Sequence, residues 1–265
     1  MESQPVMAST LGKILRRTGM AYAADTGVEQ HSIGRSIVLH LLPGALITLC
    51  YTLVAPAVRR VGFPSLLAIF LAIAVVLIPC ELGYLFYEAK RRNGRLSLTG
   101  VVLYRDRLPA WQVVFLVLGL FLWSGVVFGL YVLLDPVIIE AFFRWVPAWF
   151  FLAEDLSVYT KPALLGTWLL GLVVNGVAGP VVEELYFRGY LLPRLSRLGG
   201  WAPFVNAVLF SLYHFFTPWQ NPGRILGLLP MVYAVWWKRN IYIGIAVHCL
   251  GNLVAMLALL PLVVG

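Results

Sequence analysis

Long runs of apolar residues, separated by short polar segments, dominate the pattern along the chain. Each run approaches the ~20 residues that an α-helix needs to cross the hydrocarbon core of a bilayer. Only helices and closed barrels satisfy their backbone hydrogen bonds in lipid, and runs of this length favour helices. We therefore predict an all-α, polytopic integral membrane protein with about seven transmembrane helices, at about 36–57, 63–87, 111–134, 162–192, 202–218, 223–237 and 241–263.

Composition supports the same class. Of 265 residues, 60% are hydrophobic and 12% are charged, about half the roughly 25% charged content that is usual in soluble domains. Residues 1–35 contain basic residues but no apolar core of signal-peptide length, so they read as a mobile cytoplasmic N-terminal tail. Residues 36–265 are predicted to form a single transmembrane helical domain.

The basic residues predict the orientation. Fourteen of the twenty Lys and Arg residues lie in the segments 1–35, 88–110, 193–200 and 238–240, which share one side if the N-terminus is cytoplasmic. Positive charge favours the cytoplasmic side and contact with anionic lipid. We expect a multi-pass protein of a bacterial inner membrane with its N-terminus in the cytoplasm. The net charge of +8 is explained by these flanks, and nucleic acid is not an expected partner.

Residues 136–152 are apolar at helical spacing but also contain Glu140 and Arg144. Counting this segment as a span would put Arg194 and Arg197 on the outside. We interpret the segment as one amphipathic helix in the outer interface, where its tryptophans suit the level of the lipid headgroups.

Candidate chemistry begins with Glu183, Glu184 and Arg188, which lie within one apolar run. An ionisable residue inside a membrane helix is costly and is a functional hypothesis by default. Glu184 and Arg188 stand at i, i+4, within reach of an ion pair. Glu183 is rotated by roughly 100° from that pair and is the better candidate for a general base. The alternative is that both glutamates only neutralise basic residues near a helix end.

Two later apolar runs each contain one histidine, His214 and His248. At 1.5 Å per residue, both lie at a depth similar to that of the glutamates, which are ~12–14 Å from the predicted cytoplasmic end, so water and substrate are expected to enter from there. Either histidine alone could be a packed core residue. His248 and Asn252 share a helix face and could donate to an oxyanion. Together with the carboxylates, these groups suit peptide hydrolysis by an activated water.

These motifs resemble those of a known family. E-E-x-x-x-R at Glu183–Arg188, F-x-x-x-H at Phe210–His214 and H-x-x-x-N at His248–Asn252 follow one another as in the CPBP family. That family groups type II CAAX prenyl endopeptidases with bacterial Abi and bacteriocin-processing or immunity proteins. The resemblance spans about residues 165–255, and it places a catalytic core at about 162–258.

The resemblance implies a glutamate-dependent intramembrane endopeptidase that opens toward the cytoplasm. It would cleave a protein or peptide near its C-terminus or beside a membrane anchor. Glu183 and His214 would activate the water, His248 and Asn252 would stabilise the oxyanion, and Glu184 with Arg188 would shape the site. No cofactor is expected. The alternative is a zinc site with Glu183, His214 and His248 as ligands, which the absence of H-E-x-x-H and the nearby arginine disfavour.

Two points stay open at the level of the sequence. Glu81, at a similar depth in the second apolar run, could pair with Arg188, line the substrate entrance, or reach a wet interface without a role. The same fold could also act without catalysis, as a membrane peptide-binding, immunity or chaperone protein. His31 and His40 are assigned no role.

Overall fold

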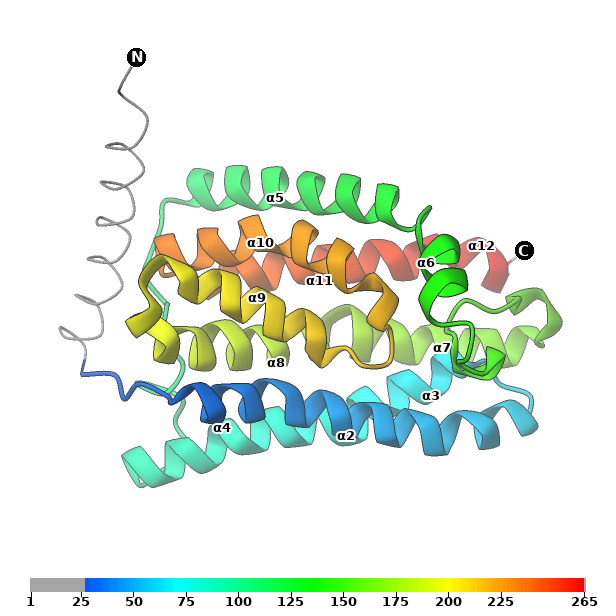
Figure 1. Ribbon diagram of the computed structural model, residues 1–265, viewed down its shortest axis with the longest axis horizontal. Helices are drawn as coiled ribbons and strands as arrows, with labels where there is room; N and C mark the ends of the chain where they lie inside the picture. Colours follow the sequence, from blue (N-terminus) through cyan, green and yellow to red (C-terminus); the bar gives the residue numbers. More distant parts are fainter. Residues whose placement is uncertain (1–26, 265) are drawn as a thin grey trace, which may run out of the picture.

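The computed structural model describes residues 27–264, and all of its regular structure is helical (Figure 1). Helices run nearly parallel to one long axis and form one bundle. This confirms the all-α class. The principal helices are α2 (Ile33–Arg60), α3 (Ser65–Ala72), α4 (Ile78–Asn93), α5 (Ala110–Tyr131), α7 (Lys161–Val173), α8 (Gly179–Glu183), α9 (Ala202–Tyr213), α10 (Asn221–Lys238), α11 (Ile241–Ala258) and α12 (Leu260–Val264).

Three π-helical segments join these helices into longer rods. Ile73–Leu77 connects α3 to α4, Val174–Ala178 connects α7 to α8, and Glu184–Leu191 continues α8. A π-helix bonds residue i to i+5 and is rare outside functional sites and local kinks. The rods that contain α3 and α8 therefore depart from α-geometry in the middle of the bundle, where their carboxylates lie.

Five helical runs are long and apolar enough to cross a membrane, as expected of a multi-pass membrane protein. One of them, Lys161–Tyr213, turns back on itself at the 3₁₀ segment Leu192–Trp201, where Gly199 has a φ of 56° and a ψ of −130°. That positive φ is open to glycine and strained for other residues. The run therefore supplies two antiparallel rods (Figure 1). Helix α10 lies in the bundle against α5 and α9 but is not among the five candidate spans, so seven membrane crossings stay a prediction.

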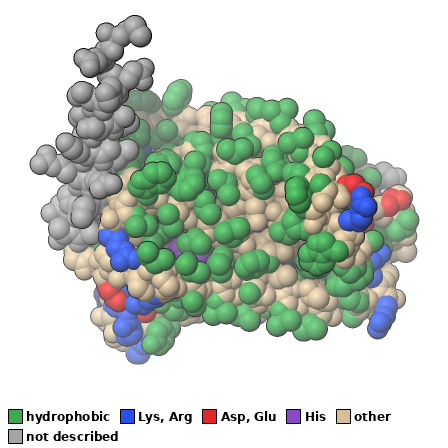
Figure 2. Space-filling model, in the orientation of Figure 1, with side chains coloured by type: hydrophobic (Ala, Val, Ile, Leu, Met, Phe, Trp, Pro, Cys, Tyr) green, Lys and Arg blue, Asp and Glu red, His purple; other side chains and the backbone are tan. Residues whose placement is uncertain are grey.

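The distribution of side chains on the surface agrees with a bundle that spans a membrane. Figure 2 shows apolar side chains over the middle of one face and charged side chains at the two ends of the bundle. Helix α5 presents the largest share of its apolar side chains to the outside of the bundle, including Trp111 and Phe115, as a lipid-facing helix does.

The two ends of the bundle are used below under fixed names. The basic end holds residues 27–32, 94–109, 192–201 and 239–240, which hydrogen-bond to one another or to adjacent helix ends through His31–Arg194 and Asp106–Arg239. The loop end holds residues 61–64 and 143–160 (Figure 1).

The prediction of one amphipathic helix over 136–152 is wrong in its extent. Helix α6 covers only Asp135–Phe142, and a separate 3₁₀ turn covers Ala148–Phe150. Pro147 explains the break, because it has no backbone N–H and disfavours helical backbone in the residue before it. Helix α6 is exposed and lies across the loop end (Figure 1).

The predicted tail, 1–35, overlaps the described residues only at 27–35, and there it is packed. The backbone N–H of His31 donates to Arg194 O at 3.0 Å, and the Gln30 side chain bonds Pro193 O and the Arg197 N–H. The prediction of a mobile tail is therefore wrong for this part, since the segment closes the basic end. Residues 1–26 lie outside the described residues.

Candidate active site

Glu183 ends helix α8 and Glu184 begins the π-helical segment that follows. Pro180 cannot donate a backbone hydrogen bond, which favours rewinding of the helix around it. Gly179 is required there, because a Cβ atom would lie 2.9 Å from Val174 O and 3.2 Å from Ile73 Cγ2. Local sequence thus sets the π-helical geometry from which the two carboxylates project.

The ion pair predicted from spacing is present. Arg188 Nη1 lies 3.2 Å from Glu184 Oε1, and both side chains are fully buried. The guanidinium also stacks 4.0 Å from the ring of Phe210. None of the three Arg188 nitrogens makes a hydrogen bond of good geometry within the described residues. Charge compensation by Glu184 and the Phe210 ring, rather than hydrogen bonding, therefore holds Arg188 in place.

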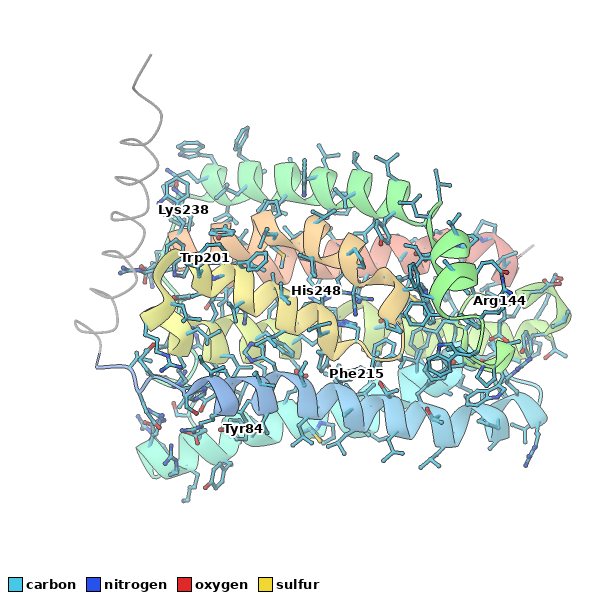
Figure 3. The ribbon with its side chains drawn as sticks, in the orientation of Figure 1. Tyr84, Arg144, Trp201, Phe215, Lys238 and His248 are labelled. Carbon is cyan, nitrogen blue, oxygen red and sulfur yellow. The ribbon has the colours of Figure 1, made fainter. Side chains whose placement is uncertain are left out.

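His248 bridges the two carboxylates. Its Nδ1 lies 3.1 Å from Glu184 Oε1 and its Nε2 lies 3.7 Å from Glu183 Oε2. Figure 3 shows His248 in the middle of the bundle, between Lys238 near one end and Arg144 near the other. Helices α8 and α11 therefore bring their polar residues to one level, as the depth estimate predicts. A carboxylate only accepts, so the Nδ1 contact requires a proton on that nitrogen.

His214 is the first residue after helix α9, with a φ of −81° and a ψ of 58°. Its Nδ1 lies 2.8 Å from Phe210 O. Because a carbonyl only accepts, Nδ1 carries the proton, and the neutral ring has a free lone pair on Nε2. His214 and Glu183 line the same cavity but are not within ion-pair distance of each other.

Asn252 lines that cavity one helical turn beyond His248. Its amide donates to Asn175 O at 2.8 Å. This acceptor lies in the π-helical segment Val174–Ala178, where carbonyls are displaced from the α-helical pattern. The bond fixes the amide and leaves its second N–H for another acceptor.

The cavity has a volume of about 1050 Å³ and mostly apolar walls. Glu183, His214, His248 and Asn252 line it, whereas Glu184 and Arg188 do not. The rotation of Glu183 away from the ion pair is therefore confirmed. From this polar cluster the cavity reaches the loop end at residues 152–157, where Ala153, Asp155 and Ser157 are exposed.

The cavity does not reach the basic end, because residues of that end do not line it. Its exposed lining residues lie at the loop end and also along helices α5 and α11, among them Gly125, Gly251, Val254 and Ala258. The cytoplasmic position of the N-terminus and the entry of water and substrate from the cytoplasm stay predictions.

Neither role considered for Glu81 is found. Its side chain is fully buried, does not line the cavity, and makes no ion pair with Arg188 within 4.0 Å among the described residues. Instead Tyr213 donates to Glu81 Oε1 at 3.0 Å. Tyr213 is held by α2, because Gly44 allows its backbone to approach Tyr213 more closely than any side chain would permit.

Sequence reasoning missed several polar residues of the interior. His40, assigned no role, is buried between Ser36 O and Asn206 Nδ2, at 2.7 and 3.0 Å, and Asn206 also donates to Phe187 O. Arg224, which was assigned no role from the sequence, is buried and lines the cavity. A polar residue inside an apolar run was the available signal for both Asn206 and Arg224.

Among residues 27–264, no three or more His, Cys, Asp or Glu side chains are grouped as metal ligands. His214 bonds Phe210 O through Nδ1, which leaves Nε2 for a water or a metal, and His248 is held between the two glutamates. A site without a cofactor stays a prediction, with zinc as the alternative.

Comparison with known families identifies the part of the chain that contains this cluster. Residues 165–254 match the Rce1-like family model, described as type II CAAX prenyl endopeptidase Rce1-like. The chain carries an Rce1-like domain. The match covers the rods from α7 to α11 and every residue of the predicted site. No curated protein and no solved structure gives a significant match. The domain implies protease activity of the intramembrane CAAX type and a protein substrate.

Proposed function

We propose that this chain is an intramembrane endopeptidase that hydrolyses a peptide bond with a water activated by Glu183 and His214. One observation carries the proposal: the glutamate without an arginine partner faces a cavity together with His214, while its neighbour Glu184 is tied to Arg188. A general base needs a carboxylate that can reach water, and two features of Glu183 support that role: it lines the cavity, and its partner within 4.0 Å is His248 rather than an arginine.

The chemistry needs no cofactor. Glu183 takes a proton from the water as its oxygen attacks the scissile carbonyl carbon, and His214 Nε2 can accept a hydrogen bond from the same water. Collapse of the tetrahedral intermediate breaks the C–N bond, and the proton held by Glu183 passes to the leaving amine. Water thus supplies the hydroxyl of the new carboxyl group and the hydrogen of the new amine.

Stabilisation of the oxyanion would come from His248 and Asn252. Asn252 has one amide N–H left after its bond to Asn175 O. His248 uses Nδ1 toward Glu184, and its Nε2 lies 3.7 Å from Glu183 Oε2. Its part therefore requires a ring protonated at both nitrogens, whose Nε2–H donates to the oxyanion instead of to Glu183. Donors fixed before the reaction stabilise developing charge without reorganisation.

A cavity of this size with apolar walls also suits a protein that binds a membrane peptide without cleaving it, as an immunity factor or chaperone would. The two functions separate at Glu183. A binding protein would tolerate Glu183→Gln, whereas the peptidase would lose its base.

The test uses the purified full chain in proteoliposomes with a library of apolar peptides in H₂¹⁸O, analysed by mass spectrometry. We expect cleavage with ¹⁸O in the new carboxyl group. Glu183→Gln should lose more than the ~10²–10⁴-fold typical of a general base, because the attacking water also loses the carboxylate that holds it. The matched control is Glu140→Gln, an exposed glutamate paired with Arg144 outside the cavity. Equal cleavage by Glu183→Gln and wild type would refute the assignment.

A further inference from the structure

Arg224 is a buried cation in an electrostatically unfavourable place. It lies in the first turn of α10, is 8% exposed and lines the cavity that contains Glu183. The N-terminus of a helix carries partial positive charge, so a cation there is destabilising and an anion is favoured. The first turn of α10 contains no acidic residue, and Gln220 at the N-cap gives no side-chain cap. Two positive features therefore meet at the cavity wall.

The hydrogen bonds of Arg224 go to neutral oxygens. Nη2 donates to Thr217 Oγ1 at 2.8 Å and to Gln220 Oε1 at 3.2 Å, and Nη1 donates to Asn221 Oδ1 at 2.9 Å and to Ser211 O at 3.4 Å. These bonds fix the guanidinium without neutralising it. The nearest carboxylate in this network is Asp135, which Gln220 Nε2 contacts at 3.0 Å. Among the described residues, no carboxylate lies within 4.0 Å of Arg224.

Two other buried arginines show what is distinctive about this setting. Arg188 is paired with Glu184 and faces away from the cavity. Arg194 also lacks a carboxylate, but it follows a helical segment and donates to Tyr190 O at 2.6 Å, at the end of the helix where cations are favoured.

Among the three buried arginines, Arg224 alone combines a guanidinium without a carboxylate within 4.0 Å among the described residues, a helix N-terminus and contact with the cavity. The carboxylates of Glu183 and Asp135 act on its charge only from a greater distance. Its four terminal N–H groups are already bonded, so Nε–H is the donor left for a ligand.

We propose that Arg224 binds the free C-terminal carboxylate of the peptide substrate. This inference rests on the proposed peptidase function and chooses, between cleavage near a chain end and cleavage beside a membrane anchor, the former. A single guanidinium matches the single charge of a carboxylate, and the apolar walls between Arg224 and the catalytic cluster suit the side chains of the last residues. Arg224 is thus a specificity-determining residue.

The experiment measures binding rather than cleavage. The probes are N-acetyl-trileucine as the free acid and as the C-terminal amide, with the full chain in lipid nanodiscs and the unfolding midpoint as readout. The acid should raise the midpoint and the amide should not. Arg224→Gln should weaken binding of the free acid by about 10- to 100-fold, the range for loss of a charge-assisted hydrogen bond. Arg224→Lys should keep part of the preference, and Arg144→Gln, at the exposed Arg144, should keep all of it.

Comparing acid with amide inside each variant cancels any general loss of stability, since Arg224 also ties Ser211 and Thr217 together. Equal effects of acid and amide on wild type would overturn the proposal. So would a preference that survives Arg224→Gln, or inorganic phosphate that binds as tightly as the acid. Failure of the proposed peptidase function gives a different result: the chain binds the acid selectively but cleaves none of the peptides in the library.

Discussion

The bundle consists of two halves that differ in packing although they share the same rods. Between the Glu183–His248 level and the basic end, it is filled by side chains such as Tyr186, Tyr190 and Leu191, each at most 2% exposed. Between that level and the loop end, it holds a cavity of about 1050 Å³. We call these the sealed half and the chamber half. We infer from this difference in packing that the sealed half fixes the catalytic groups and the chamber half receives the substrate.

The largest expected effect concerns the sealed half. Arg188→Gln leaves Glu184 buried without its cation, and loss of one partner of a buried ion pair costs about 3–5 kcal/mol. The double variant Glu184→Gln/Arg188→Gln should regain most of that free energy, because no buried charge is left unpaired. Urea unfolding of the purified protein in detergent measures both. A change below ~0.5 kcal/mol for Arg188→Gln would show that the pair does not stabilise this half.

A matched pair of glycines compares the halves directly. A Cβ atom on Gly189 would lie 2.6 Å from Val102 Cγ1, whereas one on Gly251, in the cavity wall, would meet nothing within 4 Å. Gly189→Ala should cost about 1–3 kcal/mol through overpacking. Gly251→Ala should be neutral or stabilising by up to ~1 kcal/mol, because alanine favours helix. Equal destabilisation by the two substitutions in thermal unfolding would contradict the difference in packing between the sealed half and the chamber half.

Acidification should destabilise the basic end, by less than either destabilising substitution above. Burial, then the charges of Arg35 and Arg194, lower the pKa of His31 to about 4, against the opposing effect of Glu29 and Glu88. The unfolded chain takes up this proton below about pH 6.5, and the folded chain resists until about pH 4. Stability is therefore lost as the pH falls through that window. Hydrogen exchange of residues 27–32 should rise there in wild type and less in His31→Phe, which keeps the ring.

Removing metal should have the smallest effect on the chamber half. If Glu183 and His214 activate water directly, exhaustive chelation leaves peptide hydrolysis unchanged, and elemental analysis finds less than one zinc per chain. Activity that chelation abolishes and added zinc restores would instead make Glu183, His214 and His248 the ligands.

Sequence patterns predicted what local spacing determines. The period of the α-helix gave the Glu184–Arg188 pair and the separate direction of Glu183, and rise per residue brought His248 to their level. Apolar runs located the rods because burial in lipid leaves a continuous signal. The roles of the site residues stay predictions.

Other features depend on contacts between distant segments, which spacing does not encode. The Asn206–His40 bond and the Glu81–Tyr213 bond each join helices more than 130 residues apart. The role of Arg224 was missed because a count of basic residues by loop does not register a cation that folds inward from a helix end. The π-helical segments also left no mark on the apolar pattern, and the break after Phe142 needed the backbone effect of Pro147 to be weighed against helical spacing.

The account depends most on the chamber half being the route of the substrate. The decisive measurement places a cysteine at Gly251, where a side chain has room, in a chain with Cys50, Cys80 and Cys249 replaced. Marker cysteines at Arg95 and Val158 report the basic and loop ends; both positions are exposed. An impermeant maleimide should reach Gly251→Cys from the side of Val158 and stop peptide hydrolysis. Labelling from the side of Arg95 alone, or full activity after labelling, would contradict the account.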